Sequence, residues 1–267
     1  MNTIFDIGKI LDIIQCKAET NCFLLPNEIE NLYRKGELHC YQNGDNIILL
    51  QDKATHKRLY YFINNPNTLL ELPCECDYLC DIVYRGENSP EHSVEYLQKN
   101  GFEKSALRFI YQLFYKDIVP YTMQSGCEIR YAENIDEVED ACVLFNATFD
   151  NITGDYITPE EYKSLLDSHY ITVAIDENGK IAGAYQHDCQ KNVAWGRHLA
   201  VKDGYRGRSV GKDLLYDYIE RYQAHGANRY MLWCTIDNTA AVRMYDSTGF
   251  KTIGRNCISM VKKSNII

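Results

Sequence analysis

The chain has 267 residues, of which 45% are hydrophobic and 24% are charged. This composition is typical of a folded globular protein and lies far from the disordered, fibrous and membrane-spanning classes. The formal net charge of −9 disfavours binding to nucleic acid or to an anionic membrane, because both need clustered lysine and arginine.

The N-terminal residues carry neither a basic segment nor a small-residue cleavage site, and no stretch of about 18 consecutive apolar residues occurs. We therefore expect a cytoplasmic protein. The 11 cysteines are irregularly spaced, which suits reduced thiols packed in a core better than a disulfide framework.

The first half of the chain mixes helical and extended patterns. These patterns predict a helix near 27–34, a hairpin over 46–63, a strand at 81–84, a helix over 90–100 and a long strand from Gly101-Phe102 to Tyr115. The segment from Tyr115 to Cys127 is rich in turn-forming residues and is interpreted as a linker. We expect two domains, 1–122 and 123–267, with one large domain as the alternative.

Cys74, Cys76 and Cys80 form a Cys-x-Cys-x3-Cys cluster, and His39 and Cys40 are conceivable further metal ligands. Zinc motifs usually space the first cysteine pair by about two to four residues, so the cluster does not fit them. We expect strand-buried thiols and no metal.

The second half has a regular alternation of elements. The patterns predict a strand at 128–132, helices over 135–149 and from Thr158 to near His169, strands at 170–176, 180–188 and 192–201, a helix over 209–224, a strand at 230–235, a helix over 238–248 and a final strand pair from Gly249-Phe250. Asn178-Gly179 is a hairpin turn signal between two of the strands.

Glycines, cations and a helix start converge between His198 and Lys212. Free backbone N–H groups at a helix N-terminus, together with the helix dipole, form a site for a pyrophosphate. Arg206, Arg208 and Lys212 add positive charge, and Gly207 and Gly211 let phosphate oxygens approach the backbone. A solvated helix cap is the alternative interpretation of this run by itself.

Together with the segment from Asn238 to Phe250, this run resembles the GNAT superfamily, the acetyl-CoA-dependent N-acyltransferases. The family's pyrophosphate motif is Arg or Gln, two residues, Gly, one residue, then Gly or Ala. Arg206 and Gly211 match it, whereas Ser209 stands where Gly is usual, which puts cofactor affinity in question. The second motif is matched in full, at Asn238, Ala241, Tyr245, Gly249 and Phe250.

The resemblance implies an α/β (α+β) fold with a mixed, mainly antiparallel sheet flanked by helices. This sheet splays between the strands ending at Val201 and Thr235, and the gap holds the pantetheine arm. The backbone N–H groups around Leu199 and Val201 are implied to bind the pantetheine and to polarise the thioester carbonyl. The cofactor contacts implied are Leu199, Ala200, Val201, Arg206, Gly207, Arg208, Ser209, Val210, Gly211, Lys212, Asn238, Ala241 and Tyr245.

Tyr245 resembles the general acid that protonates the departing CoA thiolate, whereas a core tyrosine is the alternative. Strand alternation predicts that Trp195 and Arg197 share a face with Leu199 and Val201. Together with Trp233, these two residues are expected to bind the acceptor.

The general base is not determined by the sequence. Its candidates are Asp155, His187 and Asp188. His198 is expected to point to the opposite face from Leu199 and to be structural, unless a β-bulge intervenes.

The function implied is transfer of acetyl from acetyl-CoA to the primary amine of a small molecule, amino acid or peptide, by a monomer or homodimer. A catalytically silent acyl-CoA sensor and a transferase of longer acyl or aminoacyl groups are the alternatives. The acceptor itself is not determined by the sequence, because one fold supports many substrates.

Residues 95–102 echo the helix-to-Gly-Phe junction after Tyr245, which suggests that the first half is a smaller, degenerate GNAT-like repeat. Leu97 stands where Tyr245 would align, and this half has no Arg-x-x-Gly-x-Gly run. We expect it to be non-catalytic and to shape the acceptor pocket or a dimer interface.

Overall fold

The computed structural model describes residues 2–3, 8, 18–86 and 89–264. Contacts divide the chain into two compact units, which we call unit 1 (residues 1–107 and 256–267) and unit 2 (residues 108–255). Contacts follow strand pairing rather than chain order, so this division departs from the expected boundary between 122 and 123. The end of β7 (Glu103–Phe114) belongs to unit 2, and the end of β13 (Lys251–Lys262) belongs to unit 1.

Unit 1 has the strand order β1-β3-β4-β5-β6-β13, with β2 paired to β5. Its elements are β1 (Asn2–Thr3), β2 (Glu19–Thr20), α2 (Pro26–Arg34), β3 (Leu38–Asn43), β4 (Asn46–Asp52), β5 (Lys57–Ile63), β6 (Tyr78–Arg85) and α3 (Glu91–Lys99). The two helices, the hairpin and the strand at 81–84 expected in this half are confirmed.

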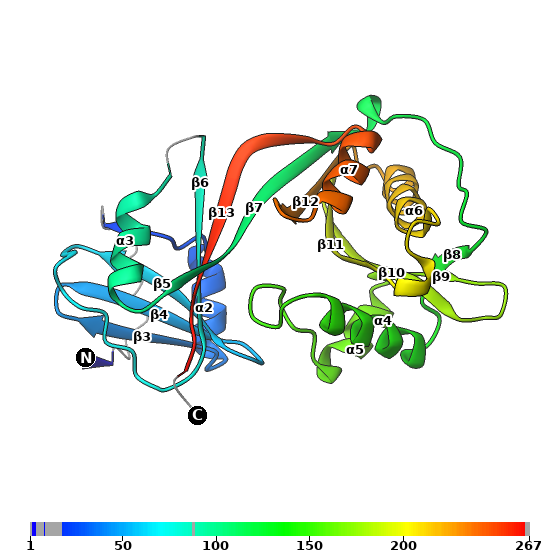
Figure 1. Cartoon of the computed structure of the whole chain (residues 1–267). Coiled ribbons are helices and arrows are strands. Elements are labelled where there is room, and N and C mark those ends of the chain that lie inside the picture. The colour runs from blue at the N-terminus through cyan, green and yellow to red at the C-terminus, as the bar shows by residue number, and fades with distance from the viewer. Residues whose placement is uncertain (1, 4–7, 9–17, 87–88, 265–267) are drawn as a thin grey trace. The chain divides into compact units, whose positions relative to one another are not determined.

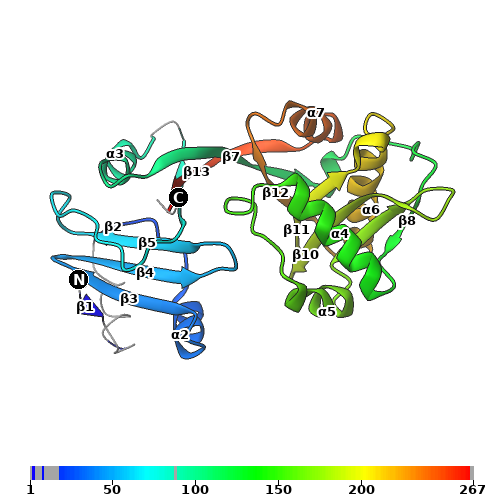
Figure 2. The same cartoon turned by 60° about the horizontal axis from the view of Figure 1, so that its bottom comes forward.

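Strand β4 is buried on both faces, because successive side chains of a strand point to opposite sides of the sheet. Ile47 and Leu49 pack in a cluster with Ile29 of α2. Ile48 and Leu50 pack instead in a cluster with Leu97 of α3. A helix therefore covers each face of the sheet in unit 1 (Figure 2).

Unit 2 has the strand order β7-β12-β11-β10-β9-β8. Its further elements are β8 (Glu128–Tyr131), α4 (Ile135–Thr148), α5 (Pro159–Asp167), β9 (Ile171–Ile175), β10 (Ile181–Gln190), β11 (Val193–Val201), α6 (Val210–Ala224), β12 (Arg229–Thr235) and α7 (Thr239–Thr248). The pairing is antiparallel except between β11 and β12, which are parallel. The mixed, mainly antiparallel fold is confirmed.

Helices cover both faces of the sheet in unit 2 (Figure 1). On one face, α4 and α5 bury a cluster that includes Val138, Phe145 and Ala200. On the other face, α6 and α7 bury a cluster that includes Leu214, Tyr185 and Tyr245. We call these the α4 face and the α6 face.

The two units repeat one pairing pattern. In unit 1, β3, β4 and β5 form an antiparallel meander and β6 follows in parallel to β5. In unit 2, β9, β10 and β11 form the meander and β12 follows in parallel to β11. An internal repeat is therefore supported by topology. The units differ in that α6 connects β11 to β12, whereas residues 64–77, between β5 and β6, form no helix.

The expected strand pair after Gly249 is wrong. Residues 251–262 form one strand, β13, and the strand beside β12 is β7 from the first half of the chain. Gly254 takes a positive φ of 67° within β13, yet the strand continues past it. The glycine accommodates an irregularity in a continuous strand instead.

The thiols of the Cys74 cluster have different surroundings. Cys80 is fully buried in β6, whereas Cys74 is exposed and Cys76 half-buried in the segment before that strand, so the expectation of strand-buried thiols is wrong for Cys74 and Cys76. Among the described residues, no group of three or more His, Cys, Asp or Glu side chains is arranged to hold a metal.

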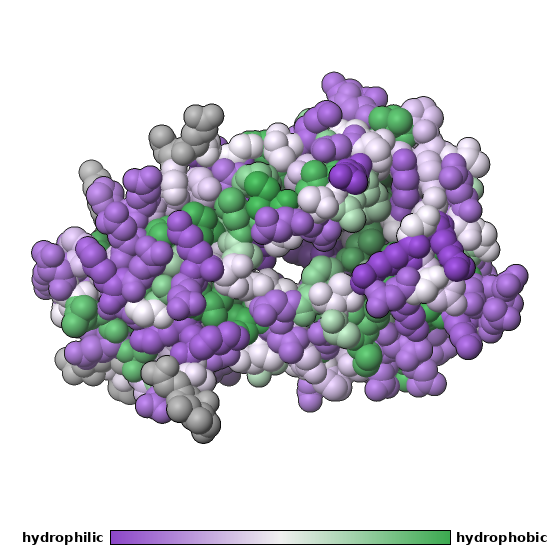
Figure 3. All heavy atoms as spheres, viewed as in Figure 1, coloured by the Kyte–Doolittle hydropathy of each residue, from purple (hydrophilic) through white to green (hydrophobic). Residues whose placement is uncertain are grey.

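The surface in the view of Figure 3 is covered mostly by hydrophilic residues, with hydrophobic residues scattered between them. Within the part of the chain that the structure describes, no helix combines the length and the apolar character that crossing a membrane requires.

Candidate functional site

Strands β11 and β12 separate partway along their length. Their parallel ladder runs from the pair Val193 and Arg229 to the pair Gly196 and Leu232. Beyond this point β11 continues to Val201 against β10, and β12 continues to Thr235 against β7. The backbone groups of β11 and β12 that face each other there lack ladder partners, which opens an edge for an extended ligand. We call this opening the gap.

A β-bulge lies in β11 where the gap begins. Tyr185 pairs with Leu199, but His187 pairs with Gly196, so Arg197 and His198 of β11 lie opposite the single residue Gln186 of β10. An extra residue of this kind reverses the alternation of side chains along the rest of a strand. The residues before and after the bulge therefore follow opposite parities.

The bulge overturns the expectation that Trp195 and Arg197 share a face with Leu199 and Val201. Ala194 packs in the α6-face cluster, so its neighbour Trp195 points to the α4 face. Past the bulge, Leu199 and Val201 pack against the α6-face cluster and Ala200 in the α4-face cluster. The prediction from simple alternation failed because β11 has one extra residue at the bulge, which reverses the faces of the residues after it.

The predicted acceptor residues nevertheless lie together. Trp195 pairs with Met231, and Trp233 lies two residues further along β12 on the same side. The Arg197 guanidinium lies 5.6 Å from the centre of the Trp195 ring. The α4 face of the sheet thus presents both tryptophans and Arg197 beside the gap.

On the α6 face, an exposed loop leads into helix α6. No side chain caps the N-terminus of this helix in the described structure, so its first N–H groups face outward with the positive end of the helix dipole. Gly207 takes a φ of 74°, and a Cβ placed on it would meet no atom within 4 Å. This open, donor-rich turn suits a phosphate group.

Ser209 lies directly before α6 with φ 65° and ψ 0°, in the left-handed region. This conformation explains physically why glycine is usual at the corresponding position of the motif. The serine therefore introduces backbone strain, and its side chain does not cap the helix.

The three cations of the loop have different surroundings. Arg206 is 64% exposed and pairs with Asp203 at 2.9 Å. The Arg208 guanidinium lies 5.9 Å from the centre of the Tyr205 ring. Lys212 instead turns its Nζ to the ring of Tyr121, at 4.6 Å, so it packs against the linker.

Contacts behind the loop hold it in place. Tyr205 donates a hydrogen bond from its hydroxyl to Asp176 Oδ2 at 2.6 Å, which links the loop to the β9–β10 turn. This bond and those from Asn178 N and Lys180 N lower the pKa of Asp176 to about 2. Gly211 lies where α6 packs on β11, and a Cβ there would make ordinary contact, at 3.4 Å, with the side chains of Leu199 and Val201.

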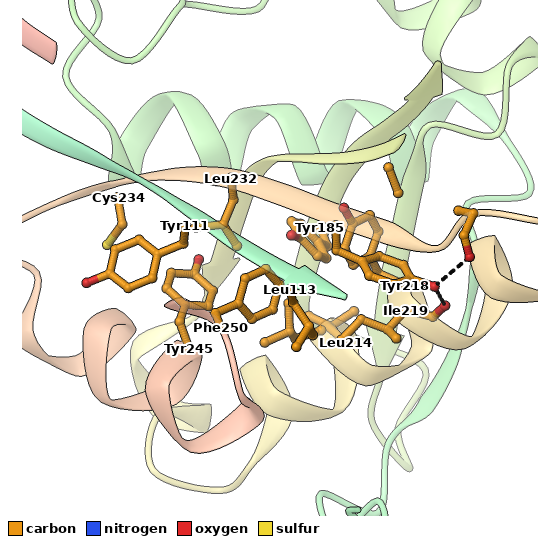
Figure 4. Packing of buried hydrophobic residues seen from close by; sticks show 14 of the residues in the cluster. Tyr111, Leu113, Tyr185, Leu214, Tyr218, Ile219, Leu232, Cys234, Tyr245 and Phe250 are labelled. Carbon is orange, nitrogen blue, oxygen red and sulfur yellow. Dashed lines mark hydrogen bonds between the residues drawn. The ribbon is translucent and has the colours of Figure 1, made fainter. Parts of the chain in front are cut away.

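Helix α7 supplies the second motif. Asn238 accepts a hydrogen bond from Ala241 N at 3.1 Å and so caps the N-terminus of α7. Tyr245 is buried on the α6 face with its ring 5.9 Å from Tyr111 and 5.7 Å from Phe250 (Figure 4). Burial raises its pKa, so the phenol keeps its proton at neutral pH.

The three candidate bases have different surroundings. His187 is fully buried between Thr172 Oγ1 (2.8 Å) and Tyr222 Oη (2.9 Å), so both ring nitrogens already have partners. Asp188 lies on the face of its pair partner Trp195, and its Oδ2 accepts a hydrogen bond from Arg197 Nε at 2.6 Å. Asp155 has a positive φ of 54° in the loop after α4.

His198 connects β11 to that loop. Its ring contacts Phe145 and Phe149, with Nδ1 beside Gln186 Oε1 at 2.5 Å and Nε2 beside the carbonyl of Gly154. Burial is the main cause that lowers its pKa, which favours the neutral ring. The side chain points away from the face of Leu199, but because of the bulge it shares the α4 face with Trp195, where it fixes the loop.

Sequence patterns did not reveal the importance of Asp213. This α6 carboxylate is 1% exposed and accepts hydrogen bonds from Tyr121 Oη, Gln124 N and Ser125 N at 2.7, 3.1 and 2.8 Å. It anchors the linker segment to the helix behind the loop. Its only sequence signal was an acidic residue in the first turn of a helix, which many helices have.

Comparisons with known proteins agree with this geometry. Residues 138–250 match the acetyltransferase (GNAT) family. A mycothiol acetyltransferase of Renibacterium salmoninarum is 31% identical over 34% of this chain and 30% of its own length. An uncharacterized N-acetyltransferase of Methanocaldococcus jannaschii is 30% identical over 32% of this chain and 42% of its own length. The chain thus spans less than half the length of either relative.

Solved structures extend the likeness to unit 1 at the level of the fold. A GCN5-related N-acetyltransferase from Sphaerobacter thermophilus has a TM-score of 0.60 at 15% identity, covering 89% of this chain and 86% of its own. A tandem GNAT protein from the clavulanic acid biosynthesis pathway has a TM-score of 0.58 at 12% identity, covering 98% and 95%.

Proposed function

We propose that unit 2, whose residues 138–250 match the acetyltransferase (GNAT) family, transfers an acetyl group from acetyl-CoA to the primary amine of a small molecule, amino acid or peptide. The observation that carries this proposal is the gap after Gly196 and Leu232. It lies between the α6 face, with the phosphate-binding loop and Tyr245, and the α4 face, with Trp195, Arg197 and Trp233.

The residues of the α6 face fit the cofactor. The uncapped N-terminus of α6 and the open space over Gly207 suit the pyrophosphate, and the exposed Arg206 adds charge. Arg208 and Tyr205 line a groove with Asp176 and Asn178 beside this loop. Acetyl-CoA supplies the acyl thioester, and the backbone of Leu199 to Val201 lies along the gap without ladder pairing to β12.

The chain's own groups support the proton transfers that the reaction needs. Tyr245 is protonated at neutral pH and therefore suits the role of general acid toward the leaving thiolate. For the base, the geometry favours Asp188 over His187, because Asp188 lies on the face of Trp195 and its Oδ1 has no hydrogen-bond partner among the described residues.

Calorimetric titration with acetyl-CoA and free CoA tests the donor site. We expect micromolar binding of acetyl-CoA by the wild type and clear weakening in Arg206→Ala, because that side chain adds charge beside the phosphates. Arg34→Ala removes a comparably exposed arginine from unit 1 and serves as the control. Absence of binding by the wild type would refute the proposal.

A catalytically silent acyl-CoA sensor is the second candidate, and Tyr245→Phe separates the two. In either case the variant should keep its affinity for acetyl-CoA. In an enzyme it should also abolish release of free CoA thiol in a screen of primary amines. A wild-type protein that binds acetyl-CoA yet releases no thiol with any amine would favour the sensor.

For unit 1 we propose a degenerate GNAT-like repeat without catalysis of its own. Residues 64–77 form no helix where unit 2 has α6, so the repeat lacks the helix N-terminus that would bind a pyrophosphate. Leu97 stands at the position of Tyr245 and is buried in the core of unit 1.

A further inference from the structure

Tyr185 carries a buried hydroxyl without a partner. The residue lies in β10 and is 1% exposed. Its Oη has no hydrogen-bond partner among the described residues. Buried hydroxyls are nearly always hydrogen-bonded, because an unsatisfied one costs about 1–3 kcal/mol. The Tyr185 hydroxyl bears this cost in the same unit as the candidate site. This suggests that a bound ligand supplies its hydrogen-bond partner.

The hydroxyl lies where the gap begins. A Cβ placed on Gly196 would fall 1.9 Å from Tyr185 Oη and 2.9 Å from Cζ. Gly196 is therefore the residue over which the phenol lies, and any side chain there would displace it. The same glycine forms the last ladder pair with Leu232 before β11 and β12 separate. The Tyr185 hydroxyl thus stands at the closed end of the gap, on the α6 face.

Tyr185 packs in a mainly hydrophobic cluster that also contains Tyr245. Tyr185 belongs to the same buried cluster as Leu232 and Tyr245, and Leu199 packs against it (Figure 4). Burial raises the pKa of Tyr185 well above its ordinary value, so the phenol stays an O–H donor at neutral pH. A donor in apolar surroundings selects a ligand with an oxygen acceptor at this depth.

We infer that the Tyr185 hydroxyl forms an acyl subsite at the closed end of the gap, where it donates a hydrogen bond to the carbonyl of the donor thioester. This inference rests on the proposed function, and it names the group that distinguishes an acyl-CoA from free CoA. The thioester has a carbonyl oxygen to accept the bond, whereas the free thiol has none.

Tyr218 provides a matched control. It is fully buried, its Oη also has no partner among the described residues, and its ring lies 5.0 Å from that of Tyr185. It projects from helix α6, and no glycine of the gap lies beneath its hydroxyl. Replacing either tyrosine by phenylalanine removes a hydroxyl without breaking a bond within the protein, so both variants should fold with unchanged or slightly higher stability.

Calorimetric titration of wild type, Tyr185→Phe and Tyr218→Phe with acetyl-CoA and with free CoA tests the inference. In Tyr185→Phe we expect acetyl-CoA to bind about 3- to 10-fold more weakly, the usual contribution of one hydrogen bond. Free CoA should bind as to the wild type, and Tyr218→Phe should change neither affinity. Thermal unfolding of each variant establishes that it is folded.

Two results would overturn the acyl subsite while leaving the proposed function intact. Tyr185→Phe could bind acetyl-CoA as tightly as the wild type, or it could lose the same factor for acetyl-CoA and free CoA. If the wild type bound neither compound, the proposed function would fail and the subsite with it.

Discussion

The backbone of Ser209 stores strain at the start of α6. A non-glycine residue in the left-handed region costs about 1–2 kcal/mol, and Ser209 has a φ of 65° there. Because the residue lies between the exposed loop and the first turn of the helix, the strain bears on both stability and the shape of the phosphate-binding turn.

We predict that Ser209→Gly raises the free energy of unfolding by up to about 1 kcal/mol, since relief of strain exceeds the added entropy of the unfolded chain. Urea unfolding measures it. Ser168→Gly is the control, because Ser168 also flanks a helix but has a φ of −90° and should lose stability. Equal losses in both variants would contradict the strain argument.

His187 makes the stability of unit 2 dependent on pH. Burial lowers its pKa from 6.5 to about 3, so the folded protein holds the ring neutral. Below pH 6.5 the unfolded chain binds a proton that the folded protein does not, and stability therefore falls as the pH falls from 6.5 toward 3. His198, whose pKa is also lowered, acts in the same direction.

We predict that His187→Gln reduces the slope of unfolding free energy against pH by about 1.4 kcal/mol per pH unit between pH 6 and pH 4. Urea unfolding at several pH values gives the slope. His225→Gln, which changes an exposed histidine at the end of α6, should leave it unchanged. An unaltered slope in His187→Gln would show that His187 is protonated in the folded state.

At the scale of elements, the β9–β10 turn supports the phosphate-binding loop through Tyr205 and Asp176. The pKa of Asp176 is lowered to about 2, so its contribution to stability is present above about pH 3.8 and is lost as the pH falls through 2. Only the loss of this contribution lies in the acid range, so at neutral pH the carboxylate is charged and holds the loop.

We predict that Tyr205→Phe raises the pKa of Asp176 toward its ordinary value and weakens acetyl-CoA binding several-fold, because the loop loses its support. An NMR titration of the carboxyl groups gives the pKa. The pKa of Asp77, which is lowered by Ser264 and Lys263, is the internal control and should not move. An unchanged Asp176 pKa would mean that the backbone donors alone hold it.

For the whole molecule, the two halves of the sequence contribute strands to each other's compact unit. Ile258 and Met260 of β13 are buried in the core built from the first half, where they pack with Tyr61 and Leu97. Residues 108–114 of β7 conversely pair with β12 of unit 2. Stability of unit 1 therefore depends on the last residues of the chain.

We predict that Met260→Ala lowers the free energy of unfolding of unit 1 by about 2–5 kcal/mol, because it leaves a cavity in a full core. Hydrogen exchange should show lost protection in β4, β5 and α3 and retained protection in α6. Ile253→Ala changes a 44% exposed residue of the same strand and should change little. If hydrogen-exchange protection were lost only in unit 2, the packing of β13 in the core of unit 1 would be contradicted.

Local patterns predicted most helices and strands correctly, because hydrophobic residues recur in each element at the spacing of a helix or a strand. Val138, Ala141, Cys142 and Phe145 recur at helical spacing in the sequence, and all four are buried in α4. The motifs likewise located the loop before α6 and the cap at Asn238, whose geometry depends on neighbouring residues only.

Tertiary structure alone decided four features. These are the exchange of β7 and β13, the face of Trp195 and Arg197, the contact of Lys212 with Tyr121, and the position of Tyr185 over Gly196. Each depends on the register between segments far apart in the chain. A single extra residue in β11 reverses every side chain beyond it, and no local pattern records such a shift. The sequence by itself determined the elements and the chemistry of the two motifs, whereas pairing between strands determined which groups meet at the gap.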